Sequence, residues 1–94
     1  MSVSLQRLVE IALRDVLDPE LGRSVVDLGL IYTIHATSDG AVAITMTTTA
    51  RGCPLAGFLR EAVAMAAGAV EGVSDVLVTL TYEPAWDPGM IAAE

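Results

Sequence analysis

The stretch that decides the fold is the junction Thr47-Thr48-Thr49-Ala50-Arg51-Gly52-Cys53-Pro54, where a threonine-rich strand gives way to a helix. Gly52 permits a sharp turn, and Pro54 suits the first position of a helix because that position needs no backbone N–H donor. The junction therefore predicts a helix that begins at Pro54, with Cys53 at its N-terminus. Unpaired N–H groups and the nearby Arg51 would favour a thiolate there. The alternative is that Cys53 is a small residue that only fills the start of the helix.

Two alternating segments before the junction predict a β-hairpin. Tyr32–Thr37 and Val42–Thr47 each alternate between two sets of side chains, and the Ser38-Asp39-Gly40 sequence between them is typical of a hairpin turn. A third alternating segment, Val76–Tyr82, predicts another strand after the second helix. A right-handed crossover through that helix would place this strand parallel to the second strand of the hairpin.

Two helices are expected on either side of the hairpin. From Ser4 to Leu17 the apolar residues recur at helical spacing. The second helix is expected from Pro54 to about Val70, with Gly72 as its C-terminal cap. Its predicted buried face consists of Leu55, Phe58, Leu59, Ala62, Val63, Ala66 and Val70. Between the first helix and the hairpin, the breaker cluster at 18–22 predicts a loop that runs to about Leu28.

The order of elements is therefore helix, strand, strand, helix, strand. This order predicts an α/β (α+β) fold: a two-layer sandwich in which two helices cover one face of a small mixed sheet. The 94 residues are enough for a single domain, 1–94. The outward face of the sheet should be partly solvated or form a subunit interface, since threonines dominate it together with Ile31, His35 and Leu77.

The charge of the chain excludes several classes of protein. Twelve acidic residues against five arginines, with no lysine, give a net charge of −7. This charge argues against a nucleic-acid partner, and the missing lysine excludes a phosphate-binding P-loop. A single cysteine cannot form an internal disulfide, and no apolar run approaches the ~20 residues that span a bilayer. We therefore expect no membrane association and a cytoplasmic location.

Carboxylates in the loop after the first helix are candidate site residues. Asp18 and Asp27 could converge on the end of the sheet where Cys53 lies, with Glu20 as a polar member of the same surface. A structural role is favoured for both aspartates. An aspartate before proline commonly organises a turn, and Asp27 stands among apolar neighbours, where it is expected to accept backbone N–H bonds.

Three further residues have both a functional and a structural interpretation. Thr49 could present its hydroxyl near the turn, although threonines in strands are more often simple β formers. His35 is interpreted as an exposed strand residue rather than a metal ligand. Trp86, between two prolines, either anchors a partner or seals the core, and sealing is favoured.

The number of cysteines limits what metal chemistry one chain can support. Common iron–sulfur clusters are held largely by four cysteines, and this chain has one. A cluster or metal held here would need a second Cys53 across a homodimer, non-cysteine ligands, external thiols or a partner protein. This favours a transient carrier or an adaptor.

Four motifs occur in order along the chain: Asp18-Pro19-Glu20-Leu21-Gly22; Val26-Asp27-Leu28-Gly29-Leu30-Ile31-Tyr32; Thr47-Thr48-Thr49 with Gly52-Cys53-Pro54; and Pro84, Trp86, Pro88, Met90 and Ile91. Together they resemble the metal–sulfur cluster assembly domain family, which includes the SufT and PaaD proteins and the eukaryotic cytosolic iron–sulfur targeting factor. The resemblance runs from about Leu5 to Ile91. Many relatives read Asp-Pro-Pro-Trp where this chain has Glu83-Pro84-Ala85-Trp86.

The resemblance implies a factor that matures or delivers iron–sulfur clusters to client proteins, with no enzymatic turnover. It implies that Cys53 is the functional thiol and a transient metal ligand. The supporting residues are then Asp18, Glu20, Asp27, Thr49, Arg51, Gly52 and Trp86. The implied partners are client or carrier proteins and a separate P-loop ATPase, and the implied cofactor is a transient iron–sulfur cluster.

Two other functions compete with this interpretation. A redox-active or nucleophilic thiol protein would use Cys53 directly, but such catalysis usually needs a general base near the thiol. A KH-type RNA-binding domain can share this order of elements. The charge of −7 and the absence of a Gly-x-x-Gly loop count against it.

Overall fold

The computed structural model describes residues 4–52 and 54–91, and its first element is α1 (Leu5–Leu13). The hydroxyl of Ser4 accepts a hydrogen bond from the backbone N–H of Arg7 at 3.2 Å, which satisfies one free donor of the first turn. The helix ends four residues before the predicted Leu17. It ends early because the N–H groups of residues 14–16 donate to carbonyls three residues back, which tightens and closes the last turn.

The predicted hairpin and third strand form one sheet. Strands β1 (Ile31–Ala36) and β2 (Ala41–Met46) pair antiparallel, and β3 (Asp75–Leu80) pairs with β2 in parallel. The order within the sheet is β1-β2-β3, so β2 is central and the other two strands are edges. The mixed sheet and the parallel pairing of the last strand are therefore confirmed.

A bulge in β1 changes which side chains face the core. Ile31 lies opposite Met46 and Thr33 lies opposite Thr45, so Tyr32 is an extra residue on β1. A bulge reverses the alternation of side chains beyond it. As a result Ile31 packs against the core, and the prediction that it shares the outward face with the threonines is wrong.

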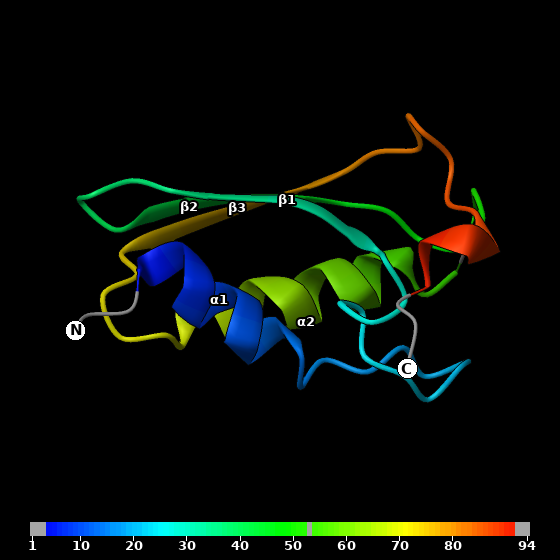
Figure 1. The fold of residues 1–94 in the computed structure, drawn as a ribbon, viewed down its shortest axis with the longest axis horizontal. Coiled ribbons are helices and arrows are strands. Elements are labelled where there is room, and N and C mark those ends of the chain that lie inside the picture. Colours follow the sequence, from blue (N-terminus) through cyan, green and yellow to red (C-terminus); the bar gives the residue numbers. More distant parts are fainter. Residues whose placement is uncertain (1–3, 53, 92–94) are drawn as a thin grey trace.

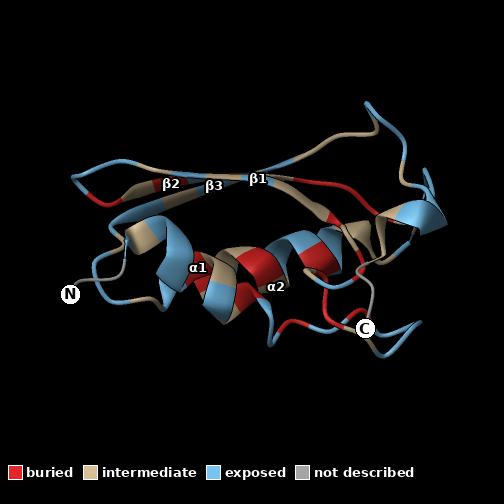
Figure 2. Ribbon diagram, viewed as in Figure 1, coloured by how far each residue is buried: buried red, intermediate tan, exposed pale blue. Residues whose placement is uncertain are grey.

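Both helices cover the same face of the sheet, as Figure 1 shows, and the core lies between the two layers. The buried apolar residues come from both helices, from β2 and from the segment before β1 (Figure 2). They are Val9, Leu13, Val16, Val25, Leu28, Leu30, Val42, Ile44, Met46, Leu59, Val63 and Ala67. This arrangement confirms the predicted two-layer sandwich.

The second helix, α2 (Ala56–Gly68), is shorter than predicted at both ends. Leu55 caps it with φ −95° and ψ 5°, so Pro54 lies in the preceding turn rather than at the first helical position. At the other end the N–H of Ala69 closes the helix. Gly72, with φ +99°, lies in the turn that leads to β3 and does not cap α2.

One residue of the predicted buried face of α2 points to solvent. Phe58 is 60% exposed. Met65, two helical turns later on the same side of the helix, is 73% exposed. The buried stripe is narrow and runs through Leu59, Val63 and Ala67 at a spacing of four. Phe58 precedes this stripe by one residue, about 100° around the helix, so the prediction that it is buried is wrong.

The outward face of the sheet has no covering layer in the described residues (Figure 1). Thr33, His35 and Thr79 are exposed there, and Leu77 is 65% exposed. The prediction that His35 is an exposed strand residue is confirmed. A short 3-10 helix, η1 (Pro88–Met90), lies near the end of the described chain. No helix in the described ranges is both long and apolar enough to cross a bilayer.

Candidate functional site at the carboxyl end of the sheet

Three segments far apart in the sequence meet at one end of the sheet, on the right in Figure 1. They are the junction after β2, the tail after β3 (Thr81–Ile91) and the loop between α1 and β1. The N–H of Thr47 donates to the carbonyl of Leu30 at 2.8 Å, and the N–H of Thr81 donates to the carbonyl of Met46 at 2.8 Å. These bonds hold the junction between the loop and the tail.

The junction begins with two buried threonines. Thr47 and Thr48 are 0% and 1% exposed. The hydroxyl of Thr48 donates to the carbonyl of Ala50 at 2.9 Å, and its oxygen also lies 2.7 Å from the hydroxyl of Tyr82. A threonine hydroxyl has one proton to donate, so Tyr82 is the donor in the second bond. These residues are therefore more than β formers, because they set the path of the junction.

Arg51 extends the contact between the junction and the tail. Its guanidinium carbon lies 5.2 Å from the centroid of the Tyr82 ring, within range of a cation–π interaction. One of its nitrogens, Nη2, lies 3.9 Å from Oε1 of Glu83, in a pair whose side chains are 72% and 90% exposed. Such an exposed pair is worth little by itself. Arg51 is therefore held mainly by the aromatic ring.

The remaining described residues of the junction are half-buried or exposed. Gly52 has φ +72° and no heavy atom within 4 Å of where a Cβ would lie, and Thr49 is half-buried. Cys53 lies outside the described residues, so the predicted role of its thiol stays a prediction. The helix begins three residues after Cys53, at Ala56, so the argument that placed Cys53 at the helix start does not hold as it was made.

Asp18 has the structural role that its sequence context predicts. It is 2% exposed, and its Oδ1 accepts the backbone N–H groups of Glu20 at 2.8 Å and Leu21 at 3.2 Å. The Asp18 backbone closes the same turn, because its carbonyl accepts from the N–H of Gly22 at 2.7 Å. Glu20 itself is exposed at the surface of this turn.

Asp27 does not have its predicted role. It is exposed, and within the described residues no hydrogen bond to its carboxylate is found. The neighbouring Leu28 and Val25 point into the core, and Asp27 points the other way on the same turn. The prediction that Asp27 accepts backbone N–H bonds among apolar neighbours is therefore wrong, although its exposure leaves it available to a partner.

Trp86 fastens the tail to the loop before β1. Its ring is partly buried against the core, and Nε1 donates to the carbonyl of Leu28 at 2.7 Å. The hydroxyl of Tyr32 donates to the carbonyl of Pro84 at 2.8 Å, which ties a second point of the tail to β1. The favoured interpretation of Trp86 as a residue that seals the core is confirmed.

Sequence reasoning missed Tyr82 as a residue of this end of the molecule. Alternation placed Tyr82 with the core residues of β3, and its contact with Thr48 spans 34 residues. Only a long-range contact could have revealed that role. The described residues also contain no cluster of three or more His, Cys, Asp or Glu side chains placed to hold a metal ion.

Comparison with known proteins identifies the family. A family model described as iron–sulfur cluster assembly protein matches residues 6–80. The chain is 48% identical over 82 residues to a Fe-S protein maturation auxiliary factor of Porphyromonas gingivalis, covering 87% of this chain and 78% of that protein. It is 31% identical over 77 residues to the Fe-S protein maturation auxiliary factor SufT of Staphylococcus aureus, covering 82% and 88%.

A solved structure agrees with this assignment. The crystal structure of a domain of unknown function from Bacillus anthracis superposes with a TM-score of 0.90 at 32% identity, covering 94% of this chain and 84% of that one. The family resemblance and the two-layer fold thus agree with the family match and the solved structure. The chain belongs to the iron–sulfur cluster assembly protein family, with SufT among its relatives.

Proposed function

We propose that the chain is an auxiliary factor in iron–sulfur protein maturation that acts through Cys53 and without enzymatic turnover. The observation that carries the proposal is the family match over residues 6–80, which contains the whole junction, all of α2 and all but the first residue of α1. Two relatives are named Fe-S protein maturation auxiliary factors, which supports the same role.

The surroundings of the junction suit contact with another protein. Thr48 and Tyr82 fix the path of its first residues, whereas Arg51 and Gly52 are exposed. An exposed arginine held over an aromatic ring offers a partner a pre-oriented guanidinium. We infer that a client or carrier protein docks over Arg51 and Gly52, beside Cys53.

A cluster would be cargo that the chain holds only briefly. One chain offers one thiolate, and a common cluster requires about four ligands. The remaining ligands would come from a second copy, from small thiols or from the partner itself. The family resemblance implies a P-loop ATPase as a further partner, and this ATPase would be a separate protein because the chain has no lysine for a P-loop of its own.

The nucleophilic-thiol alternative has no histidine close to the described part of the junction. His35 is the only histidine, and it lies opposite Ala43 on β1, toward the hairpin turn. The junction follows Met46, whose partner on β1 is Ile31. Four residues of strand between Ile31 and His35 correspond to roughly 13 Å, beyond the reach of a proton transfer.

Anaerobic reconstitution tests the proposal. Wild type, Cys53→Ser and a control, Thr33→Ala on the outward sheet face, are incubated with ferrous iron, sulfide and dithiothreitol. Iron and sulfide per chain, molecular mass and transfer to an apo-ferredoxin are then measured. We expect wild type and control to bind a labile cluster at doubled mass or with added thiol, and to transfer it, whereas Cys53→Ser does neither.

Two results would contradict the inference that one chain supplies a single cluster ligand, the thiolate of Cys53. They are a stable cluster on a monomer and a cluster retained by Cys53→Ser. If no protein binds a cluster but wild type still accelerates maturation of the ferredoxin, the chain acts as an adaptor and not as a carrier.

A further inference from the structure

The outer edge of β1 presents unpaired backbone groups. The N–H of Thr37 donates to the carbonyl of Ala41 at 2.9 Å, so this pair is hydrogen-bonded across the hairpin. Hydrogen-bonded pairs alternate along an antiparallel ladder. The backbone groups of Ile34 and Ala36 therefore point away from β2. Among the described residues no backbone bond from outside the sheet reaches them.

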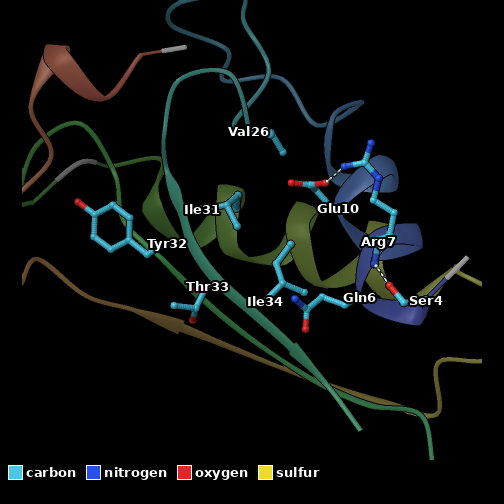
Figure 3. Close-up of a pocket in the computed structure, with 9 residues that line it drawn as sticks. All are labelled: Ser4, Gln6, Arg7, Glu10, Val26, Ile31, Tyr32, Thr33 and Ile34. Atoms are coloured by element: carbon cyan, nitrogen blue, oxygen red, sulfur yellow. Dashed lines mark hydrogen bonds and ion pairs between the residues drawn. The ribbon is translucent and has the colours of Figure 1, made fainter. Parts of the chain in front are cut away.

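A groove runs along this edge, between β1 and the first turns of α1 (Figure 3). Its first part has a volume of about 390 Å³ and is lined by Ser4, Gln6, Arg7, Glu10, Val26, Ile31, Tyr32, Thr33 and Ile34. A second hollow of about 390 Å³ continues it along Ala36–Ser38 and shares Ser4 and Gln6 with the first. The two together follow the whole strand, about 20 Å for six residues. An opening of this length fits an extended chain better than a compact small molecule.

The groove has an apolar floor and a polar rim. Ile31 and Ile34 point from β1 toward the helices, and Val26 lies at one end (Figure 3). The side chains of Arg7 and Glu10 form the opposite rim and are bonded to each other. An added strand places alternate side chains on alternate faces, so every second residue of a bound segment would enter this apolar floor.

The charge around the groove selects the partner. Arg7 is neutralised by Glu10, whereas Asp39 is exposed in the turn after β1, next in sequence to Ser38 of the second hollow. A hydrogen bond from the Thr37 hydroxyl holds the pKa of Asp39 below its ordinary value, so its carboxylate is charged. The whole chain carries −7. A basic segment is attracted to this surface, whereas a second copy of the chain is repelled by it.

We propose that β1 binds an extended segment of a partner protein as a fourth strand of the sheet. The segment carries apolar side chains at alternate positions, which enter the groove, and lysine or arginine at the positions between or beside them. Backbone hydrogen bonds to Ile34 and Ala36 supply the pairing. This site is separate from the junction and does not depend on Cys53.

The test is selection from a phage-displayed library of random dodecapeptides against the full chain, followed by synthesis of the enriched peptides. Binding is measured by titration calorimetry for wild type, Ala36→Pro and Ala85→Pro. Proline at 36 removes an N–H that faces solvent, which an edge strand tolerates. Ala85→Pro is the matched control, since position 85 is exposed and lies outside the groove.

We expect alternating, basic peptides whose affinity falls at least tenfold in Ala36→Pro and is unchanged in Ala85→Pro. Amide exchange at Ile34 and Ala36 should slow when the peptide is bound. If Ala36→Pro fails to fold, Glu10→Gln replaces it and should weaken the binding of basic peptides at low salt. The proposal is overturned if no peptide is selected, if affinity survives Ala36→Pro or Glu10→Gln, or if the same amides are protected in a concentration-dependent dimer without peptide.

Discussion

The hydroxyl of Tyr82 donates a hydrogen bond to Oγ1 of the buried Thr48 at 2.7 Å, which joins the tail after β3 to the start of the junction. The hydroxyl of the same threonine donates a hydrogen bond to the carbonyl of Ala50. One side chain thus connects the tail, the last residues of β2 and the turn that precedes Cys53.

This contact should be visible in a double-mutant cycle. We expect Tyr82→Phe and Thr48→Val each to lower the free energy of unfolding by about 0.5–1.5 kcal/mol, the usual net value of one hydrogen bond. The double variant should lose clearly less than the sum of the two, because both changes remove the same bond. Urea unfolding provides the values, with Thr33→Val on the exposed sheet face as control. Strict additivity would mean that the bond contributes nothing to stability.

The two aspartates of the loop should behave differently. Asp18→Ala removes a buried carboxylate that accepts the N–H groups of Glu20 and Leu21, so we expect a loss of about 1–3 kcal/mol, the usual value for hydrogen bonds to a charged group. Asp27→Ala should change the free energy of unfolding by less than about 0.5 kcal/mol, as is usual for an exposed residue. Urea midpoints of the two variants decide this.

A different outcome would reassign these residues. If Asp27→Ala is stable but impairs cluster transfer to the apo-ferredoxin, Asp27 belongs to the docking surface. If Asp18→Ala is as stable as wild type, the turn does not depend on the carboxylate. Asp18→Asn keeps one acceptor oxygen and should lie between Asp18→Ala and wild type.

Features encoded by neighbouring residues were predictable from the sequence. The hairpin follows from alternation on both sides of Asp39-Gly40, and the turn of Asp18 follows from an aspartate before proline. The order of elements provides two helices and three strands, and these bury their apolar faces when both helices pack on one face of the sheet. The two-layer fold was therefore also predictable. The family motifs pointed to the junction for the same reason, since its residues are contiguous.

Features that depend on distant contacts were not predictable. The bulge at Tyr32 turns that side chain toward Pro84, 52 residues away, and alternation alone cannot reveal such a shift. The helical pattern of α2 allowed a broad apolar face, but packing against the sheet buries only a narrow stripe and leaves Phe58 outside. The prediction for Asp27 was wrong for a similar reason, because the apolar residues next to it in the sequence do not surround its side chain in the folded chain.

The hairpin turn should show a measurable pH dependence. The Thr37 hydroxyl is the largest cause that lowers the pKa of Asp39 from 3.8. Because the folded-state pKa is lowered, the contribution of this carboxylate to stability is present above 3.8 and is lost as the pH falls through the lower folded value. We expect Thr37→Val to raise the pKa of Asp39, measured by NMR titration of its carboxyl carbon. The Asp39 resonance would titrate identically in both proteins if the hydroxyl had no influence.

A pair of glycine substitutions should isolate the contact between the tail and the loop before β1. Gly29 has φ +76°, and a Cβ there would lie 2.4 Å from the carbonyl oxygen of Met90. Gly22 has a similar φ of +67° but nothing within 4 Å. Both alanine variants therefore incur the same left-handed backbone strain, about 1–2 kcal/mol. Only Gly29→Ala must also displace the tail.

We expect Gly29→Ala to lose more stability than Gly22→Ala in urea unfolding and to shift the fluorescence of Trp86, since the Trp86 ring is fastened to the carbonyl of the adjacent Leu28. The emission of Gly22→Ala should match that of wild type. Equal losses in the two variants would show that the backbone strain alone accounts for the effect. The close approach of Met90 to Gly29 would then not fix the tail. The tail would be held only by its hydrogen bonds, from Trp86 to Leu28 and from Tyr82 to Thr48 of the junction.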